Sequence, residues 1–147
     1  DVDSMHAALT VAETGHLVLA TLHTNNASGT ITRLVDAFPP EKQNIIRTTL
    51  SMTLIAIVSQ QLIPNKNNGL SLAVEILINN QSIKALIREN NIHQIDNYIL
   101  SGSKDGMVRM DDAIFELYKE NIVSREEALN HAINFSELSN RINNHNI

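Results

Sequence analysis

The chain has 147 residues, a formal net charge of −5, 43% hydrophobic residues and no cysteine. This length suits one domain core with a helical appendage, and the hydrophobic content is enough for a packed interior. The acidic balance argues against nucleic-acid binding through a basic face, the lack of cysteine excludes disulfides and thiolate metal sites, and no apolar run approaches the ~18 residues of a membrane-spanning helix, so we expect no direct membrane insertion.

The first two predicted elements are a helix and a strand. Residues 4–14 carry apolar side chains at helical spacing, and Ser4 is the predicted N-cap. Residues 17–22 follow as an apolar run between His16 and His23. Because this run does not alternate with polar residues, it predicts a strand that is covered on both faces, as in a parallel sheet flanked by helices.

Two further helices are predicted after a turn at residues 24–26. Residues 27–37 and about 41–57 each carry an apolar stripe at helical spacing. The pair Pro39-Pro40 separates them, since proline ends one helix and is tolerated at the first position of the next.

A β-hairpin is predicted after the second of these helices. Residues 58–63 are strand-like, residues 64–69 have the composition of a turn, and residues 70–78 alternate. The alternation puts leucine, valine and isoleucine on one face of the second strand, and Ser71 and Glu75 on the other.

Short helical patterns fill the rest of the chain, and Ser124 with Glu127 predicts a capping box for one of them. The composition therefore divides the chain into a mixed α/β part, residues 1–79, and an all-helical part, residues 80–147. The chain begins without methionine and almost directly in a helical pattern, and we expect it to be a piece of a longer protein.

The residues alone supply no complete active site. The five glycines are too dispersed for a loop that cradles phosphates, and no two histidines have a compact metal-ligand spacing, so no metal is expected. His23 ends the predicted strand and is followed by Thr24, at the strand end where open α/β sheets bind ligands. A histidine that only packs or caps at the strand end is the alternative.

Several segments resemble the secretion ATPase superfamily, which serves type II secretion and type IV pili. Residues 13–24 and 27–39 resemble its His box and the continuation of that box, and residues 59–63 resemble a later Gln-x-Leu segment. The end of the chain resembles the last helices of the family, with Arg109 where threonine is usual and Asn121 where glycine is usual. The matches keep their order and spacing over nearly the whole chain.

Two features resemble the branch of type IV pilus retraction ATPases. The four-cysteine element of the assembly and type II secretion ATPases is absent. Residues 82–89 resemble the retraction signature Ala-Ile-Arg-Asn-Leu-Ile-Arg-Glu. The matching residues are Ile83, Leu86, Ile87, Arg88 and Glu89. The alternative is an ordinary helix with a packed face and a solvated, charged end.

The resemblance implies an α/β fold: the C-terminal part of a RecA-like P-loop ATPase core, with strands, flanking helices and a β-hairpin, followed by a small all-helical region. It implies a cytoplasmic homo-hexameric motor that uses ATP and Mg²⁺ and retracts pili through an inner-membrane platform protein. Walker A and Walker B are expected to precede Asp1. We therefore expect the chain by itself to be inactive and to bind no nucleotide tightly.

The resemblance also implies roles for five residues. His23 is expected to contact or report the γ-phosphate, directly or through Thr24. Arg33 and Asp36 are expected to brace the helix of the His box, with an electrostatic role for Arg33 as the alternative, and His16 to make a structural hydrogen bond. Two other functions stay open: a pilus-assembly or type II secretion ATPase, and a non-enzymatic module that binds a protein partner.

Overall fold

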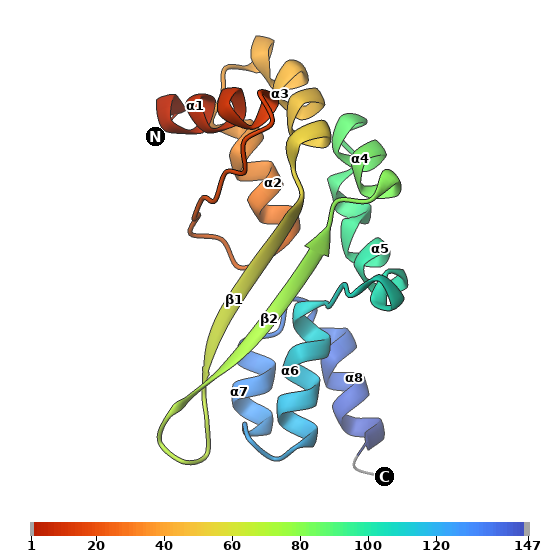
Figure 1. Cartoon of the computed structure of the whole chain (residues 1–147). Helices are drawn as coiled ribbons and strands as arrows, with labels where there is room; N and C mark the ends of the chain where they lie inside the picture. The colour runs from red at the N-terminus through yellow and green to blue at the C-terminus, as the bar shows by residue number, and fades with distance from the viewer. Residues whose placement is uncertain (1, 146–147) are drawn as a thin grey trace.

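The computed structural model describes residues 2–145, which form helices arranged along one long β-hairpin (Figure 1). In chain order the elements are α1 (Val2–Glu13), α2 (Ala27–Asp36), α3 (Pro40–Thr53), β1 (Ala56–Pro64), β2 (Leu70–Ile78), α4 (Gln81–Arg88), the 3-10 helix η1 (Ile92–Gln94), α5 (Ile95–Ser101), the 3-10 helix η2 (Ser103–Asp105), α6 (Met110–Lys119), α7 (Arg125–Asn130) and α8 (Phe135–His145). The expected α/β class with a hairpin and flanking helices is confirmed. None of the helices within residues 2–145 combines the length and the apolar character needed to cross a membrane.

The hairpin joins the two ends of the molecule. Its strands pair antiparallel from Ala56 opposite Ile78 to Pro64 opposite Leu70. The face that carries Glu75 packs inward, with Ala73 and Leu77 beside it on β2. The opposite, mainly apolar face is largely open in this chain, since four of its side chains are about half or more exposed. These are Val58, Leu62, Leu70 and Leu72.

Two hydrophobic clusters lie along the hairpin. The upper cluster joins α2, α3, α4 and α5 to the end of the hairpin that contains Ile57 and Leu77. The lower cluster joins α6, α7 and α8 to Ile63 and Ala73 near the turn. Figure 1 shows these three helices beside the lower half of the hairpin. The division of the chain at residue 80 stays a prediction, and α4 and α5, which follow that residue, pack in the upper cluster.

Local capping explains where several helices begin and end. The side chains of Asn26 and Asn80 accept hydrogen bonds from the backbone N–H groups of the third residues of α2 and α4. Ser124 accepts from the N–H of Glu127 at 3.1 Å, which confirms the serine half of the predicted capping box. The prediction that the third helix continues to residue 57 is wrong. It ends at Thr53, where Asn79 donates to the carbonyl oxygens of Ser51 and Leu54.

Two predictions for the start of the chain are also wrong. Ser4 is not an N-cap, because α1 already includes Val2. Residues 17–22 form no strand and are not covered on both faces, since Leu17 and Leu19 are 73% and 90% exposed. A strand exists only where a neighbour completes its hydrogen bonds, and the one sheet among residues 2–145 contains only β1 and β2. The apolar pattern of residues 17–22 is not sufficient for a strand, because residues 2–145 supply no neighbouring strand to pair with it.

Candidate functional site

The loop between α1 and α2 carries the predicted nucleotide-sensing residues. It runs beside an open cleft of about 630 Å³ that is also lined by α1, α2, the end of α3 and the start of β1. His16, His23 and Arg33 all line this cleft. The fold therefore brings three of the predicted site residues to one surface, although the two histidines lie seven positions apart. The side chain of His23 is exposed and open to a ligand.

Thr24 is fixed to α2 rather than directed into the same cleft. Its hydroxyl lies 2.6 Å from that of Thr30, which in turn donates to the carbonyl oxygen of Asn26 at 2.9 Å. With that donor already used, Thr24 is the donor in the first bond. Thr24 lines a neighbouring cleft of about 410 Å³ that borders β1. The residue after His23 thus holds the loop to the first turn of α2.

Asp36 lies apart from His23. It lines a third cleft, of about 670 Å³, between α1 and α2, and Arg33 borders both this cleft and the first one. Both residues belong to the last part of α2. Arg33 is therefore within reach of the surface that carries His23, whereas Asp36 is positioned to act on the α1 side of α2.

The segment that matches the retraction signature is helix α4. Ile83, Leu86 and Ile87 are buried in the upper cluster, and Arg88 and Glu89 are exposed at the end of the helix. The three apolar residues thus hold α4 against the rest of the fold, as any packed face does. Only the charged end is available to a partner, so a role in retraction for Arg88 and Glu89 stays a prediction.

A buried carboxylate that the sequence did not single out lies at the centre of the molecule. Glu75 is only 2% exposed, and its two oxygens accept from the backbone N–H of Ala27 at 2.6 Å and of Met110 at 3.2 Å. Burial raises the pKa of Glu75 above its ordinary value of 4.5, and the two backbone hydrogen bonds oppose that change. The available signal was a single acidic residue in an otherwise apolar strand.

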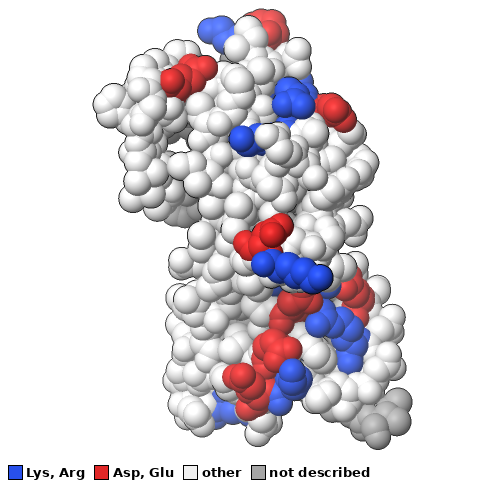
Figure 2. All heavy atoms as spheres, turned by 45° about the vertical axis from the view of Figure 1, so that its right-hand side comes forward, with Lys and Arg blue, Asp and Glu red and all other residues white. Residues whose placement is uncertain are grey.

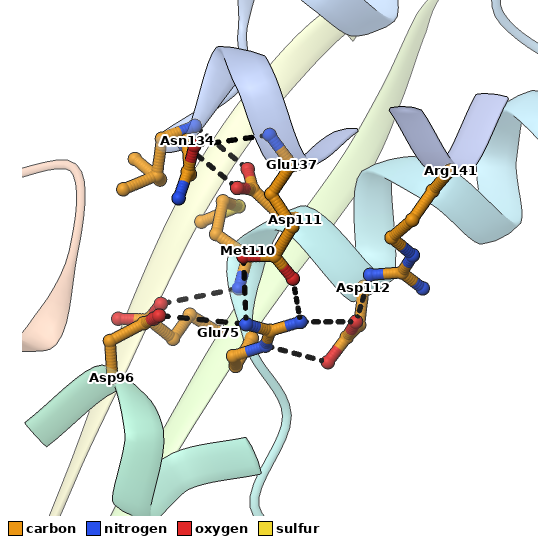
Figure 3. Close-up of polar contacts among 10 residues, drawn as sticks. Glu75, Asp96, Met110, Asp111, Asp112, Asn134, Glu137 and Arg141 are labelled. Carbon is orange, nitrogen blue, oxygen red and sulfur yellow. Dashed lines mark hydrogen bonds and ion pairs between the residues drawn. The ribbon is translucent and has the colours of Figure 1, made fainter. Parts of the chain in front are cut away.

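Arg109, just before α6, is the second polar centre. Its partners Asp96, Asp112 and Glu137 are labelled in Figure 3. Arg109 itself is only 5% exposed. Its guanidinium donates to both carboxylate oxygens of Asp112, at 3.1 and 3.2 Å, and to Glu137 at 2.8 Å. Asp96 of α5 lies 3.6 Å away, and Arg141 of α8 also binds Asp112. In the view of Figure 2, acidic and basic side chains alternate down the lower half of the surface.

These contacts set the charge states of the cluster. Burial alone would raise the pKa of Asp112, but the hydrogen bonds from Arg109 and Arg141 prevail and lower it. The hydrogen bond with Asp112 is the largest effect on Arg109 and raises its pKa. For Asp96 burial prevails over the nearby guanidinium, and its pKa is raised. Asp112 and Arg109 thus form a charged ion pair, and Asp96 is the weaker of the two carboxylates as a partner of Arg109.

Known proteins resemble the chain over most of its length. A sequence profile of the family described as "Type II/IV secretion system protein" matches residues 1–121. The twitching motility protein of Neisseria gonorrhoeae is 40% identical over 140 residues, which cover 95% of this chain and 37% of that protein. The type IV pilus retraction ATPase PilT of Pseudomonas aeruginosa is 41% identical over 128 residues, which cover 87% of this chain and 37% of that protein.

A solved structure with a similar fold is also a pilus retraction motor. A crystal structure of the pilus retraction motor PilT with bound ADP superimposes with a TM-score of 0.84 at 41% identity, over 95% of this chain and 39% of that chain. A type II secretion system protein E of Xanthomonas campestris matches only 63 residues, 43% of this chain. The chain thus spans under two fifths of its curated relatives' length, and its resemblance to the retraction ATPases is confirmed. The chain belongs to the type II/IV secretion system protein family.

Proposed function

We propose that this chain is the C-terminal part of a homo-hexameric motor that hydrolyses ATP to retract type IV pili and so drives twitching motility. The observation that carries the proposal is the extent of the match: retraction proteins align over 87% and 95% of the chain. A type II secretion ATPase aligns over 43% only. That difference favours the retraction motor over the secretion ATPase, and the shared ATPase fold favours it over a non-enzymatic module.

We infer that the whole protein binds ATP with Mg²⁺. Mg²⁺, when bound, neutralises the charge that develops on the phosphates during transfer. His23 and Arg33 suit a phosphate, since a protonated or neutral imidazole N–H and a guanidinium both donate to phosphate oxygens. The sequence has no glycine-rich loop to cradle phosphates. The cradle and the ligands of Mg²⁺ are therefore assigned to the part of the protein outside these 147 residues.

Within this chain, His23 would contact or report the γ-phosphate. Thr24 would connect a change in the position of the loop to the first turn of α2. Thr24 is suited to this because its hydroxyl bonds Thr30 of the helix. The exposed Arg88 and Glu89 at the end of α4 would face an outside partner, for which we propose the inner-membrane platform protein of the pilus. The motor would then act in the cytoplasm, at the inner membrane.

The test is ATP hydrolysis, measured as phosphate release, by the full-length protein that contains this chain. We expect the full-length protein to be active, the 147-residue chain to be inert, and full-length His23→Ala to lose about 100-fold in kcat, the scale for losing one donor to a developing charge. His93→Ala is the matched control, since His93 is exposed on η1 and should retain full activity.

Two results would overturn this proposal. An inactive full-length protein would remove the motor function itself, whereas full activity in His23→Ala would remove only the assigned role of His23. A deletion strain separates the direction of force: excess immobile pili indicate retraction, and loss of pili indicates assembly.

A further inference from the structure

Two helices begin at the same buried carboxylate. Ala27 is the first residue of α2 and Met110 is the first residue of α6, and the backbone N–H groups of both donate to Glu75. The first residues of the two helices, at positions 27 and 110, lie 83 positions apart in the sequence. The helices belong to different hydrophobic clusters. Glu75 on β2 is thus a direct polar link between the upper and the lower part of the molecule.

The chemistry of this link requires a carboxylate. The first N–H groups of a helix have no partner inside the helix, and the helix dipole gives them a partial positive charge. An ionised carboxylate has two oxygens and no donor, so one side chain accepts from both helix ends. A glutamine in the same place has one accepting oxygen, and its NH₂ group would face the other N–H.

On the upper side, the link reaches the nucleotide-sensing loop within one helical turn. Asn26 is the N-cap of α2, and its carbonyl oxygen accepts from the hydroxyl of Thr30. Thr30 in turn holds Thr24, the residue after His23. A ligand that changes the position of the loop therefore also changes the position of the N-terminus of α2, which donates to Glu75.

On the lower side, the link reaches three helices. Met110 follows Arg109, whose guanidinium binds Asp112 of α6 and Glu137 of α8 and lies near Asp96 of α5. These ion pairs, drawn in Figure 3, hold the start of α6 to α5 and α8. A displacement of the N–H of Met110 is therefore shared by the whole lower cluster.

We propose that Glu75 is a positioning residue that couples the loop of His23 and Thr24 to helices α6 to α8. It rests on the proposed function, because nucleotide is the ligand that would move the loop. When nucleotide binds at the loop, the first turn of α2 shifts and Glu75 moves with it. The hydrogen bond from the N–H of Met110 to Glu75 then changes in strength. Coupling of this kind between two sites is typically five- to 150-fold in an equilibrium constant, about 1–3 kcal/mol.

The experiment is hydrogen–deuterium exchange of the full-length protein with and without ADP, read at peptides that cover residues 24–31 and 108–114. In the wild type we expect ADP to change the exchange rate of both peptides, by about fivefold at the α6 peptide. In Glu75→Gln, ADP still binds and still changes the upper peptide, but the α6 peptide no longer responds.

A second variant separates coupling from folding. Ala27→Pro removes the N–H that donates to Glu75 and puts a ring carbon in its place, so Glu75 loses its contact with the start of α2, while proline is favoured at the first position of a helix. Asn26 has φ −153° and ψ 166°, which is compatible with a following proline. We expect Ala27→Pro to lose the ADP response of α6 in the same way. Glu116→Gln is the matched control, since it changes an exposed carboxylate of α6 that pairs with Lys119 and leaves both bonds of Glu75 in place.

The outcomes are distinct. A wild-type protein that binds no ADP in a direct titration contradicts the proposed function, and with it the ligand assumed here. A wild type that binds ADP without a response at residues 108–114 overturns the coupling, even where no variant folds. A folded Glu75→Gln or Ala27→Pro that responds like the wild type overturns it as well, and so does a loss of response in Glu116→Gln alone.

Discussion

Arg109 occupies a position at which the sequence resemblance leads us to expect a threonine. A threonine hydroxyl could satisfy one partner, whereas the guanidinium binds Asp112 with two nitrogens and Glu137 with a third contact. A planar group with five donors is suited to several carboxylates at once, and lysine would not reproduce this geometry. The substitution is thus matched by acidic residues on three helices.

The first prediction concerns this side chain. Arg109→Thr should lower the free energy of unfolding by about 2–3 kcal/mol, because it leaves Asp96 and Glu137 without their cation and Asp112 with Arg141 alone. The loss stays below the upper range for buried pairs, since the side chains of Asp96, Asp112 and Glu137 are 49%, 31% and 37% exposed and water can replace the guanidinium. Denaturant unfolding of the full-length protein measures the change.

The control for this prediction is Arg125→Ala. Arg125 is exposed and donates one hydrogen bond to Asn143 of α8, so its loss should change the free energy of unfolding by about 0.5 kcal/mol or less. Equal effects of the two variants would show that the cluster around Arg109 adds nothing to stability beyond an ordinary surface contact.

At the scale of elements, α8 is held by a side chain of α6. Asp111 is 6% exposed, and its carboxylate accepts from the backbone N–H of Ile133 at 2.7 Å and of Asn134 at 2.8 Å, just before α8 begins. These N–H groups belong to the connection between α7 and α8. Figure 3 shows Asp111 of α6 directed at Asn134, so this carboxylate helps to fix the start of α8.

The second prediction follows from this contact. Asp111→Asn removes one accepting oxygen, so one of the two N–H groups loses its partner at a cost of about 1–3 kcal/mol. Amide exchange over residues 133–138 should become faster, while exchange over α4 stays unchanged. Asp105→Asn is the control, because Asp105 is exposed on η2. Unchanged exchange in Asp111→Asn would mean that packing of Leu138 and Ile142 alone fixes α8.

Helices that are fixed by residues close in the sequence could be predicted from it. A strand, which needs a partner far away in the sequence, could not be predicted in the same way. Pro40, Asn80 and Ser124 act within one helical turn, and the predicted helices at these positions are present. Residues 17–22 were expected to form a strand, but a strand needs a neighbour that no local pattern guarantees. For the site, His16, His23 and Arg33 line one cleft, which the sequence pattern did not predict, and their roles stay predictions.

The polar centre was missed for the same reason. Glu75 meets Ala27 and Met110 across 48 and 35 positions of sequence, and Arg109 meets Glu137 across 28. Such contacts depend on how the hairpin and the helices pack, which composition and periodicity do not describe. A lone acidic residue among strand-forming apolar residues indicates only that some partner must exist, because burying an unpaired charge is costly.

At the scale of the whole molecule, the chain leaves apolar surface on one side of its hairpin. Leu17, Leu19 and Val58 are 73%, 90% and 56% exposed, and all three line the same cleft between the α1–α2 loop and the start of β1. Leu62 and Leu72 extend the exposed face along the hairpin. Contiguous apolar surface of this kind and unpaired extended backbone both favour association with another chain.

The third prediction is that the 147-residue chain by itself associates through this surface. Light scattering after gel filtration should give a mass above the 16.3 kDa of one chain, and that mass should rise with concentration because the contact is non-covalent. The double variant Leu17→Ser, Leu19→Ser should shift the mass toward the monomer, because it removes the two most exposed apolar side chains of the loop. Leu100→Ser on α5, where leucine is 49% exposed, is the control and should associate like the wild type. A wild-type chain that stays at 16.3 kDa at every concentration tested would show that this exposed apolar surface does not drive association.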